Sequence, residues 1–192
     1  GFCLVGSEMC IRDRFMVRLA LAALSVGNWG IYGPAMELQE ATPREPGSEE
    51  YFDSEKYEIK QWDRQSSHTL APFITRLNEI RKSESDLCKN GSLRIQTIDN
   101  PFLLAWSRHH PSTDNHLLII VNLKPHTSRS ARVQLDPVNF CMRPSSRLDV
   151  TDLLTGKWSS RSLEGFSVEC TPDQPVVVLR ISTNLHEASQ QQ

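Results

Sequence analysis

The densest group of side chains able to do chemistry lies at residues 47–58, in the stretch Gly-Ser-Glu-Glu-Tyr-Phe-Asp-Ser-Glu-Lys-Tyr-Glu. Its carboxylates, phenols and ammonium group are donors and acceptors that suit the hydroxyl groups of a sugar. The stretch follows residues 28–34, Asn-Trp-Gly-Ile-Tyr-Gly-Pro, whose aromatic and apolar side chains between glycines predict a buried strand. A loop of this composition after a buried strand is therefore suited to bind a ligand rich in hydroxyl groups.

Other candidate sites in the sequence are weaker. An acidic run lies within and before this stretch, but it lacks the spacing and glycine of a calcium loop, so we assign no metal ligand there. His109, His110 and His116 lie near a predicted hairpin turn without further ligands, and we expect them to be exposed turn residues. Trp106 falls within a predicted strand and is expected in the core, whereas Trp158 follows a turn and is the better candidate for an exposed platform.

Length, charge and cysteine content exclude several classes of protein. The chain has 192 residues and a net charge of −2, which leaves room for one domain, or one domain and part of another, and gives no bulk attraction to nucleic acid or anionic lipid. We expect no nucleic-acid partner and no membrane partner, because no apolar run approaches the roughly 20 residues that span a bilayer. The five cysteines form no C-x-x-C pair, which favours a reducing cytoplasm over a disulfide framework.

The N-terminal region allows two interpretations. Residues 15–25 are rich in alanine and leucine and predict a helix that ends before the predicted strand. Alternatively, Met16 begins a secretory signal peptide, with Arg18 as its charged start and an apolar run behind it. Residues 1–14 show no sustained period and resemble translated adapter sequence, so we expect a non-native leader there.

The remaining chain predicts one helix and then strands. Residues 70–81 place apolar side chains at helical spacing on one face, as expected for a helix that covers a sheet. Residues 93–97 alternate like an edge strand, and residues 117–123 form a continuous apolar run like a central strand. Further strands are predicted at residues 102–107, 131–135, 147–150 and 176–181. Short strands with turns and no helix between them predict an antiparallel β-sandwich of roughly 90 residues.

In this order the segments resemble the α-amylase superfamily, glycoside hydrolase family 13. Residues 28–33 resemble the last strand of its barrel, and the following helix and strands resemble the start of its C-terminal sandwich. Residues 46–58, with residues 32–38 upstream, resemble the α-1,4-glucan:maltose-1-phosphate maltosyltransferases, and the likeness extends over residues 15–182. The fold implied is an α/β barrel remnant, the last strand and flanking helices of a TIM barrel, followed by an all-β antiparallel sandwich.

The resemblance also implies a division of the chain. Residues 1–14 are the expected leader, residues 15–90 the C-terminal end of a catalytic (β/α)8 barrel, residues 91–183 the C-terminal β-sandwich domain and residues 184–192 a tail.

The activity implied by the resemblance is a retaining transfer of maltosyl units from α-maltose 1-phosphate to the non-reducing ends of α-1,4-glucans. The catalytic carboxylates of the family belong to earlier barrel strands, so no residue here is assigned to catalysis. The family's substrate-contacting Lys-Tyr pair falls on Lys56 and Tyr57, which would donate to sugar hydroxyls and add ring contact. In the alternative interpretation, Lys56 pairs with Glu55 or Asp53 on a solvated loop and Tyr57 packs below it. No cofactor is implied, and the full-length enzyme is expected to be a cytoplasmic homodimer.

Two other functional classes stay open at this stage. One is an α-amylase-type hydrolase or branching enzyme, which shares the architecture but should lack the acidic, tyrosine-bearing pattern of residues 48–57. The other is a secreted, non-enzymatic carbohydrate-binding β-sandwich, which requires Met16 to be a true start.

Overall fold

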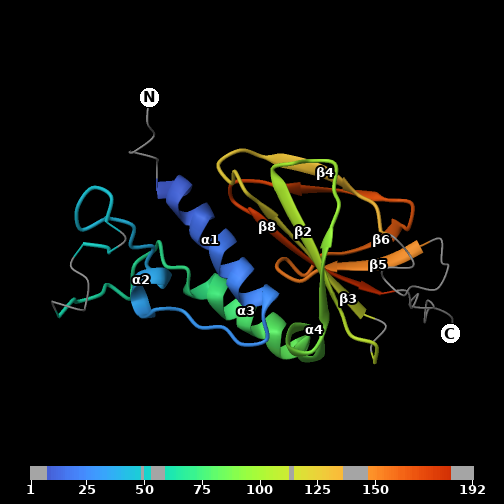
Figure 1. The fold of residues 1–192 in the computed structure, drawn as a ribbon, viewed down its shortest axis with the longest axis horizontal. Helices are drawn as coiled ribbons and strands as arrows, with labels where there is room; N and C mark the ends of the chain where they lie inside the picture. The colour runs from blue at the N-terminus through green and yellow to red at the C-terminus, as the bar shows by residue number, and fades with distance from the viewer. Residues whose placement is uncertain (1–7, 49, 53–58, 113–114, 136–146, 183–192) are drawn as a thin grey trace, which may run out of the picture.

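The computed structural model describes the chain apart from residues 1–7, 49, 53–58, 113–114, 136–146 and 183–192, and the described part forms three layers (Figure 1). Helices α1 (Glu8–Ser25) and α3 (Ala71–Ser83) lie on a six-stranded sheet, and a two-stranded sheet covers its other face. Two short helices, α2 (Gly33–Glu37) and α4 (Ser85–Lys89), precede the strands.

The sheets are antiparallel and open. The larger has the order β1 (Ser92–Gln96), β2 (Leu103–His109), β3 (Asn115–Asn122), β8 (Val176–Ser182), β5 (Arg147–Asp152) and β6 (Trp158–Ser162). The smaller pairs β4 (Arg129–Val133) with β7 (Phe166–Cys170). The predicted antiparallel sandwich is therefore present in the described residues, with one face of its larger sheet covered by helices.

Strand β3 explains the layering. Its side chains alternate between two hydrophobic clusters: Leu117, Ile119 and Val121 pack toward the helices, while Leu118 and Ile120 pack toward the two-stranded sheet. A strand buried on both faces must be apolar at successive positions, which is why the run at residues 117–123 predicted a central strand. That prediction is confirmed, and β1 lies at one edge of the sheet, as its alternation predicted.

Helix α1 carries small and branched residues into the same cluster as α3. Leu19, Ala23 and Leu24 of α1 and Leu77 and Ile80 of α3 are all buried there. The helix predicted at residues 15–25 is confirmed, and it ends where expected, but the structure continues it back to Glu8. Among the described residues, no helix is long and apolar enough to cross a membrane.

The first turns of α1 contain a polar group that the fold does not satisfy. Asp13 is buried, and neither of its carboxylate oxygens has a hydrogen-bond partner among the described residues. Burial raises its pKa above the usual range, against the smaller lowering effect of Arg14. Buried carboxylates in native structures are nearly always paired, so this position is locally inconsistent with its surroundings.

The prediction of a buried strand at residues 28–34 is wrong. The structure has no strand there: the chain runs in irregular conformation to Tyr32 and then enters α2, with Pro34 in its first turn. Tyr32 is 62% exposed. A central barrel strand needs a hydrogen-bonded neighbour on each side, and the described chain supplies neither, so the local apolar pattern alone does not make a strand.

Strands β6 and β7 were not predicted: Trp-Ser-Ser-Arg-Ser is short and largely polar, and Phe-Ser-Val-Glu-Cys alternates apolar and polar residues over only five positions. The prediction of exposed turn histidines is also wrong for two of the three: His109 is half-buried in β2, and His116, in β3, is 3% exposed. His116 lies opposite His109 on the neighbouring strand, and their rings stack with centroids 4.4 Å apart. The prediction that Trp106 belongs to the core is confirmed, since it is 1% exposed.

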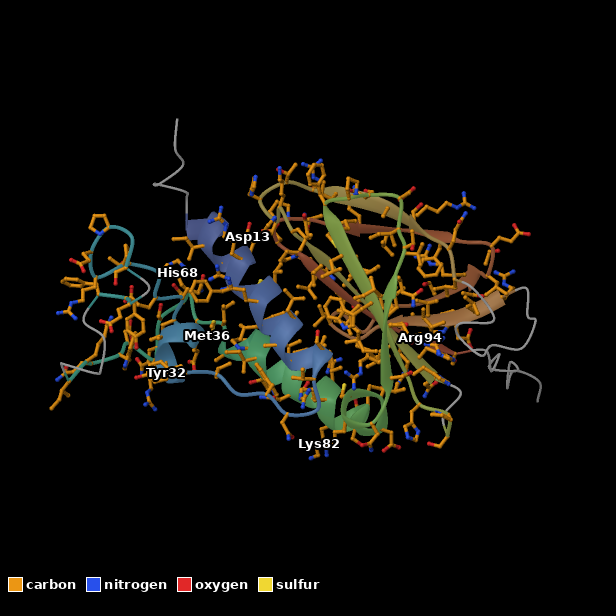
Figure 2. All side chains as sticks on the ribbon, in the orientation of Figure 1. Asp13, Tyr32, Met36, His68, Lys82 and Arg94 are labelled. Carbon is orange, nitrogen blue, oxygen red and sulfur yellow. The ribbon has the colours of Figure 1, made fainter. Side chains whose placement is uncertain are left out.

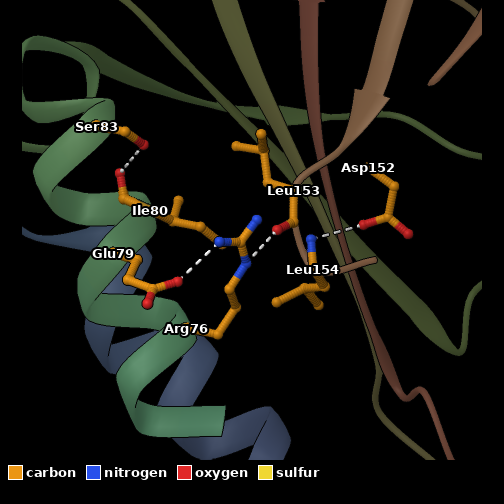
Figure 3. Close-up of polar contacts among 7 residues, drawn as sticks. All are labelled: Arg76, Glu79, Ile80, Ser83, Asp152, Leu153 and Leu154. Atoms are coloured by element: carbon orange, nitrogen blue, oxygen red, sulfur yellow. Dashed lines mark hydrogen bonds and ion pairs between the residues drawn. The ribbon is translucent and has the colours of Figure 1, made fainter. Parts of the chain in front are cut away.

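Arginine side chains join the helices to the sheet by donating to backbone carbonyls. Arg76 of α3 donates from Nε to the carbonyl of Leu153 at 2.7 Å and forms an ion pair with Glu79 (Figure 3). Leu153 follows β5, so this bond fixes the C-terminal end of that strand against the helix layer.

Arg108 of β2 makes the most buried of these contacts. Its guanidinium donates to the carbonyls of Leu87 at 2.8 Å, Cys88 at 3.0 Å and Ser25 at 2.6 Å. These carbonyls belong to α4 and to the last residue of α1, where helix carbonyls lack partners within the helix. One planar side chain therefore satisfies both helices at the sheet surface.

Candidate functional site

The candidate site is the long connection between α1 and α3, which carries the polar stretch singled out in the sequence. Lys56 and Tyr57, the predicted substrate-contacting residues, lie outside the described residues. The structure describes the chain on both sides of them, up to Phe52 and again from Ile59.

A tight reversal sets the first flank. Pro43 and Tyr51 form an antiparallel bridge, the Phe52 amide donates to the Thr42 carbonyl at 2.7 Å, and the Arg44 amide donates to the Glu50 carbonyl at 2.8 Å. At the turn, Gly47 has a φ of +84°, in the left-handed region that favours glycine. The reversal brings Phe52 back beside Thr42.

Lys60 joins this flank to the other one. Its ammonium group forms an ion pair with Glu40 at 2.7 Å and donates to the Phe52 carbonyl at 3.2 Å. The Lys60 and Glu40 side chains are only 17% and 19% exposed. Because Phe52 belongs to the first flank and Lys60 to the second, this bond joins the two described flanks.

The environment of Glu40 keeps this ion pair charged. Burial by itself would raise the pKa of Glu40, but the hydrogen bond and positive charge of Lys60, together with the Thr42 amide at 3.0 Å, outweigh burial and lower that pKa. The Lys60 ammonium is therefore committed to Glu40 and Phe52. A second cation for a ligand would have to come from elsewhere in the loop.

Aromatic rings surround the Lys60 ammonium. Its Nζ lies 4.4 Å from the centre of the Trp62 ring and 5.4 Å from that of Tyr51. The Tyr51 ring lies 6.4 Å from the Trp62 ring and 6.5 Å from the Tyr32 ring. These distances suit cation–π and edge-on aromatic contacts. The Tyr51 hydroxyl is buried without a hydrogen-bond partner among the described residues.

Around this cluster, apolar side chains face solvent. Tyr32 is 62% exposed, Phe52 51% and Ile59 99%. Figure 2 shows Tyr32, Met36 and His68 together at the α2 end of the molecule, with Lys82 farther along at the α3 end. Large exposed rings beside hydrogen-bonding groups are suited to bind a sugar, whose faces are apolar and whose edges carry hydroxyls.

Contacts with α3 fix the connection to the rest of the fold. The Leu70 amide donates to the Glu37 carbonyl at 2.8 Å, and the Thr69 hydroxyl donates to the Glu37 carboxylate at 3.1 Å. Arg12 of α1 donates to the His68 carbonyl at 3.0 Å. The described part of the chain holds no cluster of three or more residues able to bind a metal ion.

Sequence reasoning placed the site in this connection but missed the residues that shape it. Glu40 appeared only as one member of an acidic run, and Lys60 and Tyr51 had no assigned role. The available signal was that Lys60 and Trp62 alternate two residues apart just after the polar stretch, so that both point to one side of an extended chain.

Comparison with known protein families identifies the second half of the chain. Residues 95–181 match the family described as "GLGE, C-terminal". These residues include all of the strands from β2 to β8 apart from the end of β8, so the match covers the sandwich.

Curated relatives match over more of the chain than the sandwich. The chain is 40% identical over 157 residues to the α-1,4-glucan:maltose-1-phosphate maltosyltransferase of Methylacidiphilum infernorum, covering 78% of this chain and 23% of that enzyme. It is 40% identical over 150 residues to maltosyltransferase 2 of Streptomyces coelicolor, covering 76% of this chain and 22% of that enzyme. The chain thus spans about a quarter of the length of these relatives.

Solved structures support the fold. A maltogenic α-amylase, AmyB from Thermotoga neapolitana, superposes with a TM-score of 0.64 at 11% identity over 90% of this chain and 37% of its own. A variant of AmyP in complex with maltotriose superposes with a TM-score of 0.67 at 17% identity over 91% of this chain and 35% of its own. At such identities the likeness concerns the fold alone. The matched C-terminal domain and the curated relatives, which share one enzyme name, show that the chain is related to the α-1,4-glucan:maltose-1-phosphate maltosyltransferases and contains their C-terminal domain.

Proposed function

We propose that this chain is part of a retaining glycosyltransferase that moves maltosyl units from α-maltose 1-phosphate to the non-reducing ends of α-1,4-glucans and releases phosphate. The observation that carries the proposal is the sequence identity of 33% to 40% between this chain and relatives that share one enzyme name. Because the chain spans a quarter of those relatives, the activity belongs to the longer protein, and this chain contributes to substrate binding.

In a retaining mechanism, a carboxylate attacks the anomeric carbon and forms a covalent glycosyl-enzyme while a second carboxylic acid protonates the leaving group. The second group then removes the proton from the acceptor hydroxyl as it attacks the intermediate. We place both carboxylates in barrel strands of the longer protein, and we expect residues 1–192 alone to be inactive.

Residues 53–58 are the proposed contact of this chain with substrate. The Lys56 ammonium would donate to sugar hydroxyls, and Tyr57 would add a hydroxyl and a ring face. The bond from Lys60 to the Phe52 carbonyl supports this role, because a segment whose ends are held loses less conformational entropy on binding.

We also propose that the longer enzyme is a cytoplasmic homodimer. The cysteines support the cytoplasmic location. Cys88 and Cys170 are both free and buried in the described structure, as expected for a protein that does not rely on disulfides.

A chimera tests the proposed function. The C-terminal part of the Methylacidiphilum infernorum enzyme is replaced by residues 15–182 of this chain, and phosphate release from α-maltose 1-phosphate is measured with and without maltohexaose. We expect acceptor-dependent phosphate release and products longer by two glucose units. Release of free maltose with no lengthening of maltohexaose would instead identify an α-amylase-type hydrolase and contradict the proposal.

A further inference from the structure

A pocket lies between the first half of α1 and the turn that follows β3, and it takes no part in the site described above. Its volume of about 480 Å³ is within the range of pockets that hold small organic ligands, about 300–1,000 Å³. Arg14, Val17 and Arg18 line it from α1, and residues 122–126 line it from the end of β3 and the turn. In Figure 1 this turn, between β3 and β4, lies beside the first half of α1.

Two arginines stand on the helical wall of this pocket. Arg14 and Arg18 are four residues apart on α1, a spacing that places both side chains on one face of the helix, with Val17 between them. Both arginines are exposed, and neither guanidinium makes a hydrogen bond or ion pair with the residues that the structure describes. Like charges at this spacing destabilise a helix, so an anion held between the two would relieve their repulsion.

The opposite wall adds further positive groups. His126 is exposed in the turn, and Lys124 precedes it by two residues. The Lys124 ammonium lies 4.6 Å from the centre of the Phe102 ring, a contact that leaves its charge without an anionic partner. No aspartate or glutamate is among the residues that line the pocket. The pocket is therefore basic, although the chain as a whole has a net charge of −2.

The carboxylate closest in sequence to these cations does not neutralise them. Asp13 precedes Arg14, but it is only 1% exposed and is not part of the pocket wall. Burial raises the pKa of Asp13, against the smaller lowering effects of Arg14 and His126. Because burial favours the uncharged form of this carboxyl group, the arginines of the pocket are left without a full counter-charge from it.

The chemistry of the walls selects the class of ligand. Guanidinium groups donate in pairs to the oxygens of phosphates and carboxylates. A phosphate monoester offers three oxygens and nearly two negative charges, and can therefore accept from both Arg14 and Arg18. Leu123, which is 50% exposed, and Pro125 add apolar surface beside the cations. A ligand with a phosphate group and an organic part would use both kinds of surface.

We infer that this pocket binds an organic phosphate monoester, with Arg14 and Arg18 donating to the phosphate oxygens and the organic part lying against Leu123 and Pro125. Sugar phosphates and nucleoside monophosphates share this chemistry. The inference does not rest on the proposed function, since the pocket is built from α1 and the turn after β3 and contains none of residues 53–58.

Isothermal titration of the full 192-residue chain at low ionic strength tests the inference, with α-glucose 1-phosphate and AMP as separate probes. Glucose and adenosine are the controls that lack the phosphate group. Arg18 lies beyond the expected leader of residues 1–14, so it is the residue to replace first. We expect Arg18→Ala to weaken binding by at least about tenfold, as for the loss of one charged hydrogen-bonding group. Alanine favours helix, so the variant should stay folded, which circular dichroism checks.

Lys82→Ala is the matched control, because it also removes one exposed positive charge from a helix. Figure 2 shows Lys82 far from Asp13, the neighbour of Arg14. We expect this variant to bind the probes like the parent chain. Equal loss of binding in Lys82→Ala and Arg18→Ala would show a general effect of charge and overturn the inference.

The two probes distinguish the sources of the phosphate group. Binding of α-glucose 1-phosphate alone would identify a sugar phosphate site, binding of AMP alone a nucleotide site, and binding of both a site that requires only the phosphate; each supports the inference if Arg18→Ala weakens it. The inference is wrong if neither probe binds, if glucose or adenosine binds as tightly as its phosphate, or if Arg18→Ala binds like the parent. The chimera assay is independent of these results, since it measures turnover and not binding to this pocket.

Discussion

Arg76 donates a 2.7 Å hydrogen bond from Nε to the backbone carbonyl of Leu153, and this contact ties α3 to the end of β5 (Figure 3). Arg76→Ala would leave that carbonyl without its charged donor. We expect a loss of about 1–2 kcal/mol in the free energy of unfolding, measured by urea titration. Lys82→Ala, at an exposed position on the same helix, should change it by less than about 0.5 kcal/mol. Equal effects of the two substitutions would contradict this role of Arg76.

Arg108→Ala should be the more damaging change. The buried carbonyls of Leu87 and Cys88 and the partly buried carbonyl of Ser25 would lose their donor. Unsatisfied buried acceptors cost about 1–3 kcal/mol each, so we expect a total loss above about 3 kcal/mol. Arg108→Lys should recover little of it, because an ammonium lacks the planar fork that reaches three acceptors. A fully stable Arg108→Lys variant in thermal unfolding would show that charge alone suffices.

His109, whose ring stacks on that of His116, should make the fold sensitive to acid. Burial, followed by the charges of Arg94 and His110, lowers the pKa of His109 below its usual 6.5. The unfolded chain therefore binds a proton at higher pH than the folded chain does. Stability should be constant above about pH 6.5 and fall as the pH drops through the lowered pKa. Thermal unfolding from pH 7.5 to 5.0 measures this loss of stability, and the His109→Gln variant should lose less than the parent. If the variant and the parent have the same pH profile, His109 is not the cause of the acid sensitivity.

The buried thiols should be unreactive in the folded protein. Burial raises the pKa of Cys170 to about 12, with a smaller contribution from Glu169. Burial also raises the pKa of Cys88. Iodoacetamide at pH 8 should leave both residues unmodified in native buffer and modify both in guanidinium chloride, as read by peptide mass spectrometry. Rapid native alkylation of Cys170 would show that the sandwich opens.

Local patterns predicted those parts of the fold whose neighbours are supplied by this chain. The apolar run of β3 and the helical spacing of α3 were informative because both elements are buried by the described residues. The pattern at residues 28–34 failed, since a barrel strand depends on strands that the described structure does not provide. Strand β6 was missed because its residues are exposed or half-buried at the edge of the sheet and all but Trp158 are polar.

The sequence predicted where the candidate site lies but not which contacts form it. The polar loop is conspicuous in composition, whereas the contacts among Glu40, Tyr51 and Lys60 depend on a chain reversal that brings distant residues together. No periodicity encodes such a reversal. It follows from the turn at Gly47 and from the bridge between Pro43 and Tyr51.

The measurement that most directly tests the account is the kinetics of the chimera carrying Lys56→Ala, with Lys82→Ala as its control. If Lys56 contacts the maltosyl unit, kcat/KM for α-maltose 1-phosphate should fall by about 10–100-fold, the value of a charged hydrogen bond, while Lys82→Ala stays near the parent. A Lys56→Ala chimera within twofold of the parent would contradict the claim that this chain contacts substrate through residues 53–58.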